Sequence, residues 1–284
     1  MRDDKIRTFL TLCDTMNYRL AAERLHITQP AVTQHIHALE QYYGCRLFSY
    51  DGRRLQKTDD AATLEVYARG MVYQEQKLMQ ALHPLPVNHL TIGATKTIGE
   101  CVIAGQAARF LKNPRNRLDV LVGNTQEMLH LLEQGQIDFA LVEGNFDRTQ
   151  YDCRLYRREP FGGLCSRDHP FAGRTVPLEE LFGETLLLRE PGSGTRYVLE
   201  QVLTQANRSL LEFARVVTVS SFGLLCDLTA QGAGISFAYE AIAQSHPRLA
   251  RFHVEAWDIT REFNYVFLRC TDAAAAVDLF ESCR

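Results

Sequence analysis

The sequence predicts a small helical N-terminal domain that carries a β-hairpin, one long helix after it, and an α/β domain in the C-terminal two-thirds. Two changes in the spacing of apolar residues predict this order. Up to about residue 43 and again over residues 61–82, apolar side chains recur at intervals of three and four, which is typical of helices. Beyond residue 88, short apolar runs such as LTIGA and LDVLVG alternate with helical segments, which indicates parallel strands joined by helices.

Composition and length fit a globular protein with more than one domain. The chain has 284 residues, of which 46% are apolar and 23% charged, so neither a disordered chain nor a membrane protein is indicated. No stretch approaches the roughly 18 consecutive apolar residues that cross a bilayer, and the start MRDDKIRTFL lacks the apolar segment of a secretion signal. We therefore expect a cytoplasmic protein with no membrane partner.

The sequence contains no recognisable catalytic or metal-binding motif. Its eight cysteines lie far apart and form no C-x-x-C pair, and there is no H-E-x-x-H or phosphate-loop sequence. The run P-G-S-G-T around Ser193 lacks the spacing of a catalytic serine turn. Asp138 and Glu143, in and at the end of an apolar strand, are expected to be structural or cleft-lining carboxylates. We therefore predict no metal, no cofactor and no enzymatic activity.

The net charge of −3 is unevenly distributed along the chain. Residues 1–58 contain nine basic and six acidic side chains and so carry +3, which leaves −6 for the rest. The overall charge argues against a protein that coats nucleic acid non-specifically, whereas a local basic surface fits a specific contact. The N-terminal segment is therefore the candidate nucleic-acid-binding part.

The first part of the chain has the pattern of three helices. Apolar residues recur at helical spacing in residues 6–16, and a second set follows in residues 20–25. Thr28 can cap a third helix, Pro30 is tolerated in its first turn, and Gly44 should end it. Two helices separated by a short turn, the second opening with T-Q-P, fit a helix-turn-helix whose second helix enters the DNA major groove.

A hairpin and a long helix are predicted next. Residues 45–58 have the alternation of two short strands around a turn at Asp51-Gly52, and this hairpin is the candidate wing of a winged helix-turn-helix. Over residues 59–87, an apolar stripe that ends at Leu82 predicts one helix, which the following prolines terminate.

The polar side chains of the third helix and the basic side chains of the wing are the expected DNA contacts. Glutamine, threonine and histidine can hydrogen-bond base edges or phosphates, alanine can contact a methyl group, and arginine and lysine can neutralise phosphates. The expected contacts are Gln29, Pro30, Ala31, Thr33, Gln34, His37, Arg53, Arg54 and Lys57. Gln34 and Thr33 are the expected main readers of sequence. The alternative is that residues 1–58 form only a packing module with solvated polar faces.

The α/β part offers a candidate small-molecule site at the end of its first strand. LTIGA leads into Thr95-Lys96-Thr97 and then a helix, so hydroxyls, backbone N–H groups and the helix dipole would converge on an anionic or carbonyl ligand. Lys96 is the only cation of this loop and favours an anion. The hydroxyls could instead be ordinary helix N-caps, an alternative that applies to Thr97, Thr125 and Thr195.

Several motifs resemble the LysR-type transcriptional regulators. The segment NYRLAAERLHITQPAVTQHIHALEQYYGCRLFSYDGRRLQKT carries A-A-x-x-L, T-Q-P-A, I-x-x-L-E, G-x-x-L-F and G-R-R at the spacing of that family's DNA-binding segment. LTIGATKTIGE, GNTQEMLHLLEQGQIDFALVEG, LREPGSGTR and GAGISF are similar to its effector domain, so the resemblance covers almost the whole chain. It implies a sequence-specific transcriptional regulator that binds operator DNA and responds to a small-molecule effector.

The resemblance also implies an architecture and an assembly. The expected domains are a winged helix-turn-helix (1–58), a dimerising linker helix and hinge (59–87), and a two-lobed effector-binding domain like the periplasmic ligand-binding proteins (88–284). The expected lobes are lobe I (88–160 and 263–284) and lobe II (161–262), with crossings near 159–161 and 261–263. The long helix would pair two subunits, and such regulators commonly form tetramers from two dimers, so a homodimer or homotetramer is expected. The alternative is that this helix packs on its own effector domain.

In members of that family, loops after several strands border a cleft between the lobes. By this resemblance the expected effector contacts are Thr95, Lys96, Thr97, Asn124, Thr125, Ser193 and Thr195. Effector binding would shift an existing equilibrium of assembly shapes and alter how DNA is contacted or bent, without covalent chemistry.

The recognition helix and the wing depart from the family pattern. Thr33-Gln34-His35 stands where Ser-Arg-Gln is frequent, and Tyr50 stands where arginine is usual, so fixed positive charge is lower here. Phosphate contacts would then depend on the basic residues of the wing, and DNA binding would vary with pH through His35 and His37.

Two other functions remain open at the level of sequence. Some members of the family sense oxidants through a cysteine pair, and here Cys165 and Cys226 fall in a predicted strand and a predicted helix. The chain could also be a ligand-binding protein whose N-terminal segment serves only subunit contacts.

Overall fold

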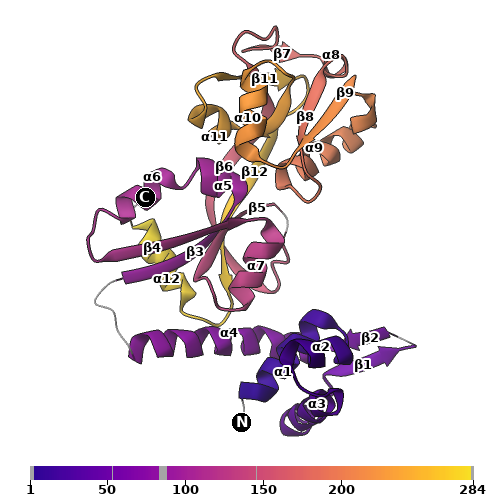
Figure 1. The fold of residues 1–284 in the computed structure, drawn as a ribbon, viewed down its shortest axis with the longest axis vertical. Helices are drawn as coiled ribbons and strands as arrows, with labels where there is room; N and C mark the ends of the chain where they lie inside the picture. The colour runs from indigo at the N-terminus through magenta and orange to yellow at the C-terminus, as the bar shows by residue number, and fades with distance from the viewer. Residues whose placement is uncertain (1–2, 53, 83–87, 145, 283–284) are drawn as a thin grey trace. The chain divides into compact units, whose positions relative to one another are not determined.

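The computed structural model divides the chain into two compact units, one N-terminal and one made of the α/β domain (Figure 1). The structure describes residues 3–52, 54–82, 88–144 and 146–282. The first unit also includes the short segments Glu133–Gly135 and Leu268–Asp272. Each unit has its own apolar core, in agreement with a chain of this length.

The N-terminal elements occur in the predicted order. They are α1 (Asp3–Thr15), α2 (Tyr18–Leu25), α3 (Gln29–Tyr43), β1 (Phe48–Asp51), β2 (Arg54–Lys57) and α4 (Asp59–Leu82). The hairpin pairs β1 with β2 in antiparallel register, with Asp51 opposite Arg54. The winged helix-turn-helix predicted from periodicity is therefore present.

Local side-chain chemistry sets the ends of the two helices of the helix-turn-helix. Asn17 starts α2, because its Oδ1 accepts a hydrogen bond from the backbone N–H of Arg19 at 2.9 Å. Thr28 starts α3, where its Oγ1 accepts from the backbone N–H of Ala31 at 3.3 Å. Gly44 ends α3 with φ of 69°, a left-handed conformation that glycine adopts at little cost.

Helices α1, α2 and α3 pack around one apolar core that the start of α4 also joins. Phe9, Ala21 and Ile36 are buried from the first three helices, and Ala61 and Ala68 are buried from α4. Burial of this stripe orients α3, so that its opposite, polar face is directed to solvent.

The predicted apolar stripe of α4 divides between two environments. Its N-terminal part is in the core, whereas Met71, Leu78 and Leu82 are 53%, 56% and 63% exposed. The prolines expected to end this helix lie outside the described residues. The C-terminal half of α4 therefore presents apolar surface that is not covered within the described part of the chain.

The α/β domain begins with β3 and continues to the last helix. Its strands are β3 (Asn88–Thr95), β4 (Asn116–Gly123), β5 (Phe139–Glu143), β6 (Tyr151–Ser166), β7 (Thr175–Val176), β8 (Thr185–Arg189), β9 (Arg215–Val219), β10 (Ser236–Tyr239), β11 (Leu249–Val254) and β12 (Ile259–Leu268). Its helices are α5 (Lys96–Cys101), α6 (Ala104–Phe110), α7 (Thr125–Glu133), α8 (Leu178–Leu181), α9 (Gly194–Gln205), the 3-10 turn η1 (Leu210–Glu212), α10 (Phe222–Ala230), α11 (Glu240–Ser245) and α12 (Ala273–Glu281).

One sheet runs through this domain in the order β4-β3-β5-β12-β6-β11-β7, with β10 paired to β6, and β8 and β9 form a separate pair. Strand β3 is parallel to β4 and to β5, as the strand-helix-strand pattern predicts. However, β12 is antiparallel to β5, and both β10 and β11 are antiparallel to β6. The parallel pairing predicted for the first strand-helix-strand segments is thus confirmed. The antiparallel pairs involve strands far apart in the chain, and the spacing within a segment does not reveal which distant strand will pair with it.

Two long strands connect the two halves of the domain (Figure 1). We call the half built on β3, β4 and β5 lobe I, and the half built on β7 to β11 lobe II. Strands β6 and β12 are neighbours in the sheet and extend from one lobe into the other. The predicted crossing points near 159–161 and 261–263 fall inside these strands. In the part of the chain that the structure describes, no helix is long and apolar enough to span a bilayer.

Candidate functional site

The exposed face of α3 is the first candidate site. Gln29, Pro30, Thr33, Gln34 and His37 line an open groove on this helix. The side chains that point the other way fill the core, so the helix separates polar and apolar faces as predicted. Ala31, the remaining predicted contact on this helix, is half-buried near the start of α3. A polar helix face free of its own domain can enter a DNA groove.

The two histidines of α3 have different environments. His35 is half-buried, and its Nδ1 lies 2.8 Å from Oγ1 of Thr8 in α1, so it helps to join two helices. His37 is exposed, and its Nδ1 lies 3.2 Å from Oε2 of Glu40. Of the two histidines expected to make DNA binding pH-dependent, only His37 is placed to meet a ligand from solvent.

The wing offers fewer unpaired basic groups than predicted. Arg54 is exposed at the start of β2, whereas Nζ of Lys57 lies 2.7 Å from Oε2 of Glu65 in α4. Arg53 lies outside the described residues. Tyr50 is 65% exposed on β1. Within the described wing, Arg54 is thus better placed than Lys57 to contact a phosphate.

A buried group of charges lies behind the wing. Glu65 Oε1 accepts a hydrogen bond from a guanidinium nitrogen of Arg69 at 2.6 Å, and that same nitrogen donates to Asp14 at 2.7 Å. Burial alone would raise the pKa of Glu65, but hydrogen bonds from Lys57 and Arg69 lower it. These contacts join β2, α4 and α1, so the position of the wing depends on them.

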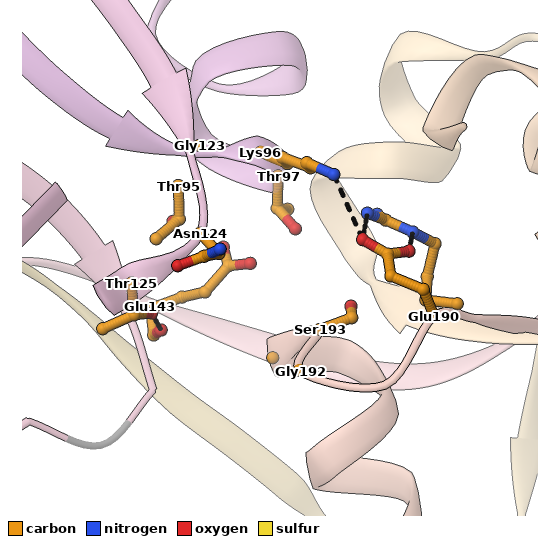
Figure 2. Close-up of a pocket in the computed structure, with 12 residues that line it drawn as sticks. Thr95, Lys96, Thr97, Gly123, Asn124, Thr125, Glu143, Glu190, Gly192 and Ser193 are labelled. Carbon is orange, nitrogen blue, oxygen red and sulfur yellow. Dashed lines mark hydrogen bonds and ion pairs between the residues drawn. The ribbon is translucent and has the colours of Figure 1, made fainter. Parts of the chain in front are cut away.

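The second candidate site is a cleft between the loops of lobe I and lobe II (Figure 2). Its empty volume is about 340 Å³, part of it open to solvent, which suits a small ligand. It is lined by Thr95, Lys96, Thr97, Gly123, Asn124, Thr125, Glu143, Arg189, Glu190, Gly192, Ser193 and Gly194. Six of the seven predicted effector contacts are in this set. The seventh, Thr195, is buried behind Ser193, and the two hydroxyl oxygens are 3.0 Å apart.

The alternative that the threonines are helix N-caps is wrong in this structure. Thr97, Thr125 and Thr195 each lie inside their helix, in its first residues. Asn124 takes the capping role at α7, since its Oδ1 accepts from the backbone N–H of Glu127 at 2.9 Å. Ser193 is the N-cap residue of α9 but makes no side-chain cap hydrogen bond, which leaves its hydroxyl directed to the cleft region (Figure 2).

An ion pair joins the two sides of the cleft. Lys96 Nζ of lobe I lies 3.1 Å from Oε1 of Glu190 in lobe II (Figure 2). Arg189 binds the same carboxylate with two nitrogens, at 2.8 and 2.9 Å. Partial burial would raise the pKa of Glu190, but the hydrogen bonds from Arg189 and Lys96 lower it to about 2. Glu190 is therefore ionised at neutral pH.

Arg189 and Glu190 line the cleft but were not predicted to do so from the sequence, although both lie in the LREPGSGTR segment that resembles the family's effector domain. The available signal was their position at the end of a strand, where parallel strands direct their loops to one edge of a sheet. Glu143 was expected to line a cleft or serve structure, and it does line the cleft from the end of β5.

Glu143 is a buried carboxyl group in the floor of the cleft. It is 5% exposed, and its Oε2 accepts no hydrogen bond from the residues the structure describes. Burial raises the pKa of Glu143 to about 7, and the neighbouring Thr97 and Thr95 hydroxyls and the charge of Arg189 offset this effect only in part. Oγ1 of Thr95 is also buried and forms no hydrogen bond to the described residues.

The two cysteines considered as a redox pair do not have the environment of a redox sensor. Cys165 and Cys226 are both buried. Burial raises the pKa of the Cys165 thiol to about 11 and that of the Cys226 thiol to about 12, which disfavours the reactive thiolate. Among the described residues, no group of side chains is arranged to hold a metal ion.

Comparison with known families matches both parts of the chain. The family model described as "Bacterial regulatory helix-turn-helix protein, lysR family" matches residues 4–62. The model described as "LysR substrate binding domain" matches residues 84–284.

Curated relatives are similar over most of the chain. The transcriptional regulator CysL of Bacillus subtilis is 28% identical over 271 residues, which cover 93% of this chain and 90% of the relative. The transcriptional regulator CfxR of Cupriavidus necator is 30% identical over 239 residues, which cover 82% of this chain and 74% of the relative.

Solved structures share the fold at lower identity. A full-length OxyR variant from Pseudomonas aeruginosa has a TM-score of 0.63 at 20% identity, with coverage of 100% of this chain and 94% of that chain. The regulatory domain of CcmR from Synechocystis, solved in complex with 2-PG, has a TM-score of 0.60 at 20% identity, with coverage of 69% and 98%. The two-lobed expectation for the effector domain is thereby confirmed at the level of fold.

Proposed function

This chain belongs to the LysR family of transcriptional regulators, and from that premise we propose that it reads operator DNA with the exposed face of α3 and is controlled by a small anion in the interlobe cleft. Members of the family are regulators that bind DNA and a small-molecule effector, so the chain is a regulator and not an enzyme.

The single observation that carries the DNA-reading proposal is the division of α3 into two faces. Thr33, Gln34 and His37 line the open groove, while the core holds the other face in place. A glutamine can bind adenine through two hydrogen bonds, and a threonine can bond a base or touch the thymine methyl group. Arg54 on the wing would neutralise a backbone phosphate and position α3 on the duplex.

Gln34→Ala tests this assignment directly. We expect the variant to lose about 1–3 kcal/mol of discrimination between the operator and unrelated DNA, because one bidentate base contact is removed. Fluorescence anisotropy at fixed salt, with DNA selected from a genomic fragment pool, measures both affinities. Gln205→Ala is the matched control, since Gln205 is exposed on α9 of the effector domain. Unchanged selectivity in Gln34→Ala, together with unchanged selectivity in Thr33→Ala, would contradict the assignment.

The effector proposal is supported by the donors that surround the cleft. Lys96 supplies an ammonium group with donors beyond the one used by Glu190, and Thr97 and Ser193 supply hydroxyl groups. Asn124 and Thr125 border the same space. This donor set favours an anionic ligand with several acceptor oxygens. The related regulatory domain of CcmR was solved with 2-PG, which makes that compound a rational member of a ligand screen.

A thermal-shift screen with small organic acids, inorganic anions and 2-PG tests the cleft. A ligand at a hundred times its Kd should stabilise the protein by about 2.7 kcal/mol, and Thr97→Ala and Ser193→Ala should lower that stabilisation. Thr204→Ala is the matched control, because Thr204 is exposed on α9 and bonds only its own helix. A ligand that stabilises both cleft variants as strongly as the wild type would exclude the cleft as its site.

We also propose a cytoplasmic homodimer or homotetramer with domains at residues 1–58, 59–87 and 88–284. The apolar surface of α4 supports pairing through this helix, since Tyr67, Met71, Leu78 and Leu82 are each more than half exposed. The edge strand β4 also exposes Val120, Leu121 and Val122, which would provide a second contact for a larger assembly.

A further inference from the structure

Glu143 is the group in the cleft whose role the proposed function leaves open. It is the last residue of β5, and its carboxyl lies near the hydroxyls of Thr97 and Thr95 (Figure 2). A buried polar atom without a hydrogen bond costs free energy. We therefore expect a bound ligand to supply the missing hydrogen-bond partner. Oε2 of Glu143 and Oγ1 of Thr95 are both such atoms in the described structure, and both residues line the same cleft.

The surroundings of Glu143 contain one nearby cation and several neutral groups. Arg189 approaches from β8, the Cys101 thiol from α5 and the Tyr239 phenol from β10. Arg189 is already bound by Glu190 through two hydrogen bonds. Tyr239 is fully buried against Phe161 and Phe263, with ring centroids 5.4 and 4.9 Å away. Glu143 therefore has no direct ion-pair partner among the described residues.

The charges of the cleft balance differently with and without a proton on Glu143. Lys96 and Arg189 contribute two positive charges, and the ionised Glu190 contributes one negative charge. With Glu143 neutral, the lining carries one net positive charge and can balance an anion. With Glu143 ionised, the lining is neutral, and a second carboxylate faces any anion that enters a space with low dielectric.

We propose that Glu143 is a ligand-binding residue whose carboxyl is protonated and neutral when an anion is bound. The cleft therefore takes up one proton with each small oxyanion it binds. The proton comes from solvent, stays on the Glu143 carboxyl and is donated in a hydrogen bond to an oxygen of the ligand. Lys96 and the hydroxyls of Thr97 and Ser193 donate to its other oxygens. This inference rests on the proposed anionic effector and adds the requirement for a proton.

A ligand that donates hydrogen bonds to Glu143 would change the protonation of the cleft in the opposite direction. A ligand with an ammonium or other donor group would bind Glu143 in its ionised form, and binding would then release a proton or leave the protonation unchanged. The sign of the proton transfer therefore distinguishes the two kinds of ligand.

Calorimetry of the full chain with sulfate and with formate as probes measures this transfer. Both anions stay ionised over the range used, so any proton taken up belongs to the protein. Titration at about pH 7.5 in buffers of different ionisation enthalpy should show uptake of more than half a proton per anion. The Kd should rise about tenfold for each pH unit above 7, because the ionised cleft must first recover its proton. The absence of proton uptake, or the release of protons on binding, would overturn the proposal.

Variants assign the proton to Glu143. Glu143→Gln places a neutral donor at the same position, so we expect one Kd from about pH 6 to pH 8.5 and no proton uptake. Asp138→Asn is the matched control, since Asp138 is a buried carboxylate that accepts from the backbone N–H of Thr91 at 2.9 Å and does not line the cleft. This control should keep the wild-type pH dependence. A pH dependence that persists in Glu143→Gln would contradict the assignment.

Lys96→Ala distinguishes failure of the proposed anion site from failure of the proposed role of Glu143. Binding that Lys96→Ala weakens, without proton uptake in the wild type, would refute the role of Glu143 and leave the anion site intact. If neither anion binds the wild type at about pH 6, or if Lys96→Ala binds them undiminished, both the anion site and the role of Glu143 are wrong.

Discussion

Glu143 should also make the stability of the ligand-free protein depend on pH. Burial raises its pKa to about 7 in the folded protein, whereas in the unfolded chain the carboxyl has its ordinary pKa of 4.5. Between these values the folded protein holds more protons than the unfolded one, so the free energy of unfolding falls as pH rises through this window. The stabilisation is complete below the unfolded pKa and is lost above the folded pKa. Each pKa unit corresponds to about 1.4 kcal/mol, which gives a loss of roughly 3 kcal/mol.

Urea unfolding at about pH 5, 6.5 and 8 measures this dependence. Glu143→Gln should remove it and should be more stable than the wild type at the highest pH, since no charge has to be buried. The control Asp138→Asn should keep the wild-type slope. Parallel curves for the wild type and Glu143→Gln would show that the carboxyl is ionised in the fold at little cost.

Cleft residues could be predicted from the sequence where they directly follow a predicted strand. Thr95, Lys96 and Thr97 follow the first strand directly, so any parallel sheet brings them to its edge. The pairing of Glu190 with Lys96 could not be predicted, because it joins residues 94 positions apart in sequence. The sequence also did not reveal that Lys57 is held by Glu65, because that contact depends on how the hairpin packs against α4.

At the scale of elements, the charges behind the wing should set its stability. Glu65→Ala leaves Lys57 and the buried Arg69 without their shared carboxylate. We expect a loss of about 3 kcal/mol in the free energy of unfolding, because Lys57 loses its ion-pair partner and the buried Arg69 loses one of the carboxylates that balance its charge. Urea unfolding of the full chain measures it. Glu75→Ala, at an exposed position of the same helix, should change stability by less than about 0.5 kcal/mol. Equal effects of the two substitutions would refute the structural role of the charge group.

The wing itself should contribute to DNA binding through Arg54. Arg54→Ala should weaken binding to all DNA sequences about equally and reduce the salt slope of log Kd by about 1, as loss of one phosphate contact requires. Lys57→Ala should change the slope less, because Nζ of Lys57 is bound to Glu65. Anisotropy titrations at several salt concentrations measure both slopes. A loss confined to one DNA sequence would assign Arg54 to base reading instead.

The elements themselves followed from local chemistry. The N-cap at Thr28, the left-handed Gly44 and the turn at Gly52 are each specified by a residue type with a strong conformational preference. Strand pairing was less predictable, since β12 pairs with β5 from far along the chain, and nothing in the spacing of either segment specifies its partner.

At the scale of the whole molecule, α4 should control assembly. Leu78→Glu places a charge among the exposed apolar side chains of its C-terminal half, and we expect the mass in solution to shift toward the monomer at micromolar concentration. Light scattering after size-exclusion chromatography measures the mass. Leu211→Glu is the control, because Leu211 is 92% exposed and belongs to the 3-10 turn η1 of the effector domain. An unchanged mass in Leu78→Glu would assign the subunit contact to another surface.

The path of the chain through β6 and β12 makes lobe II an insertion within lobe I. Its polypeptide leaves and returns through two strands that are neighbours in one sheet, so its two ends lie side by side. Exchange of lobe II between related regulators therefore needs only two adjacent cuts, while the order of strands in lobe I stays as it is. Five of the twelve residues that line the cleft belong to lobe II and would be replaced as a single block, so Lys96, Thr97 and Glu143 would meet a new counterpart across the cleft.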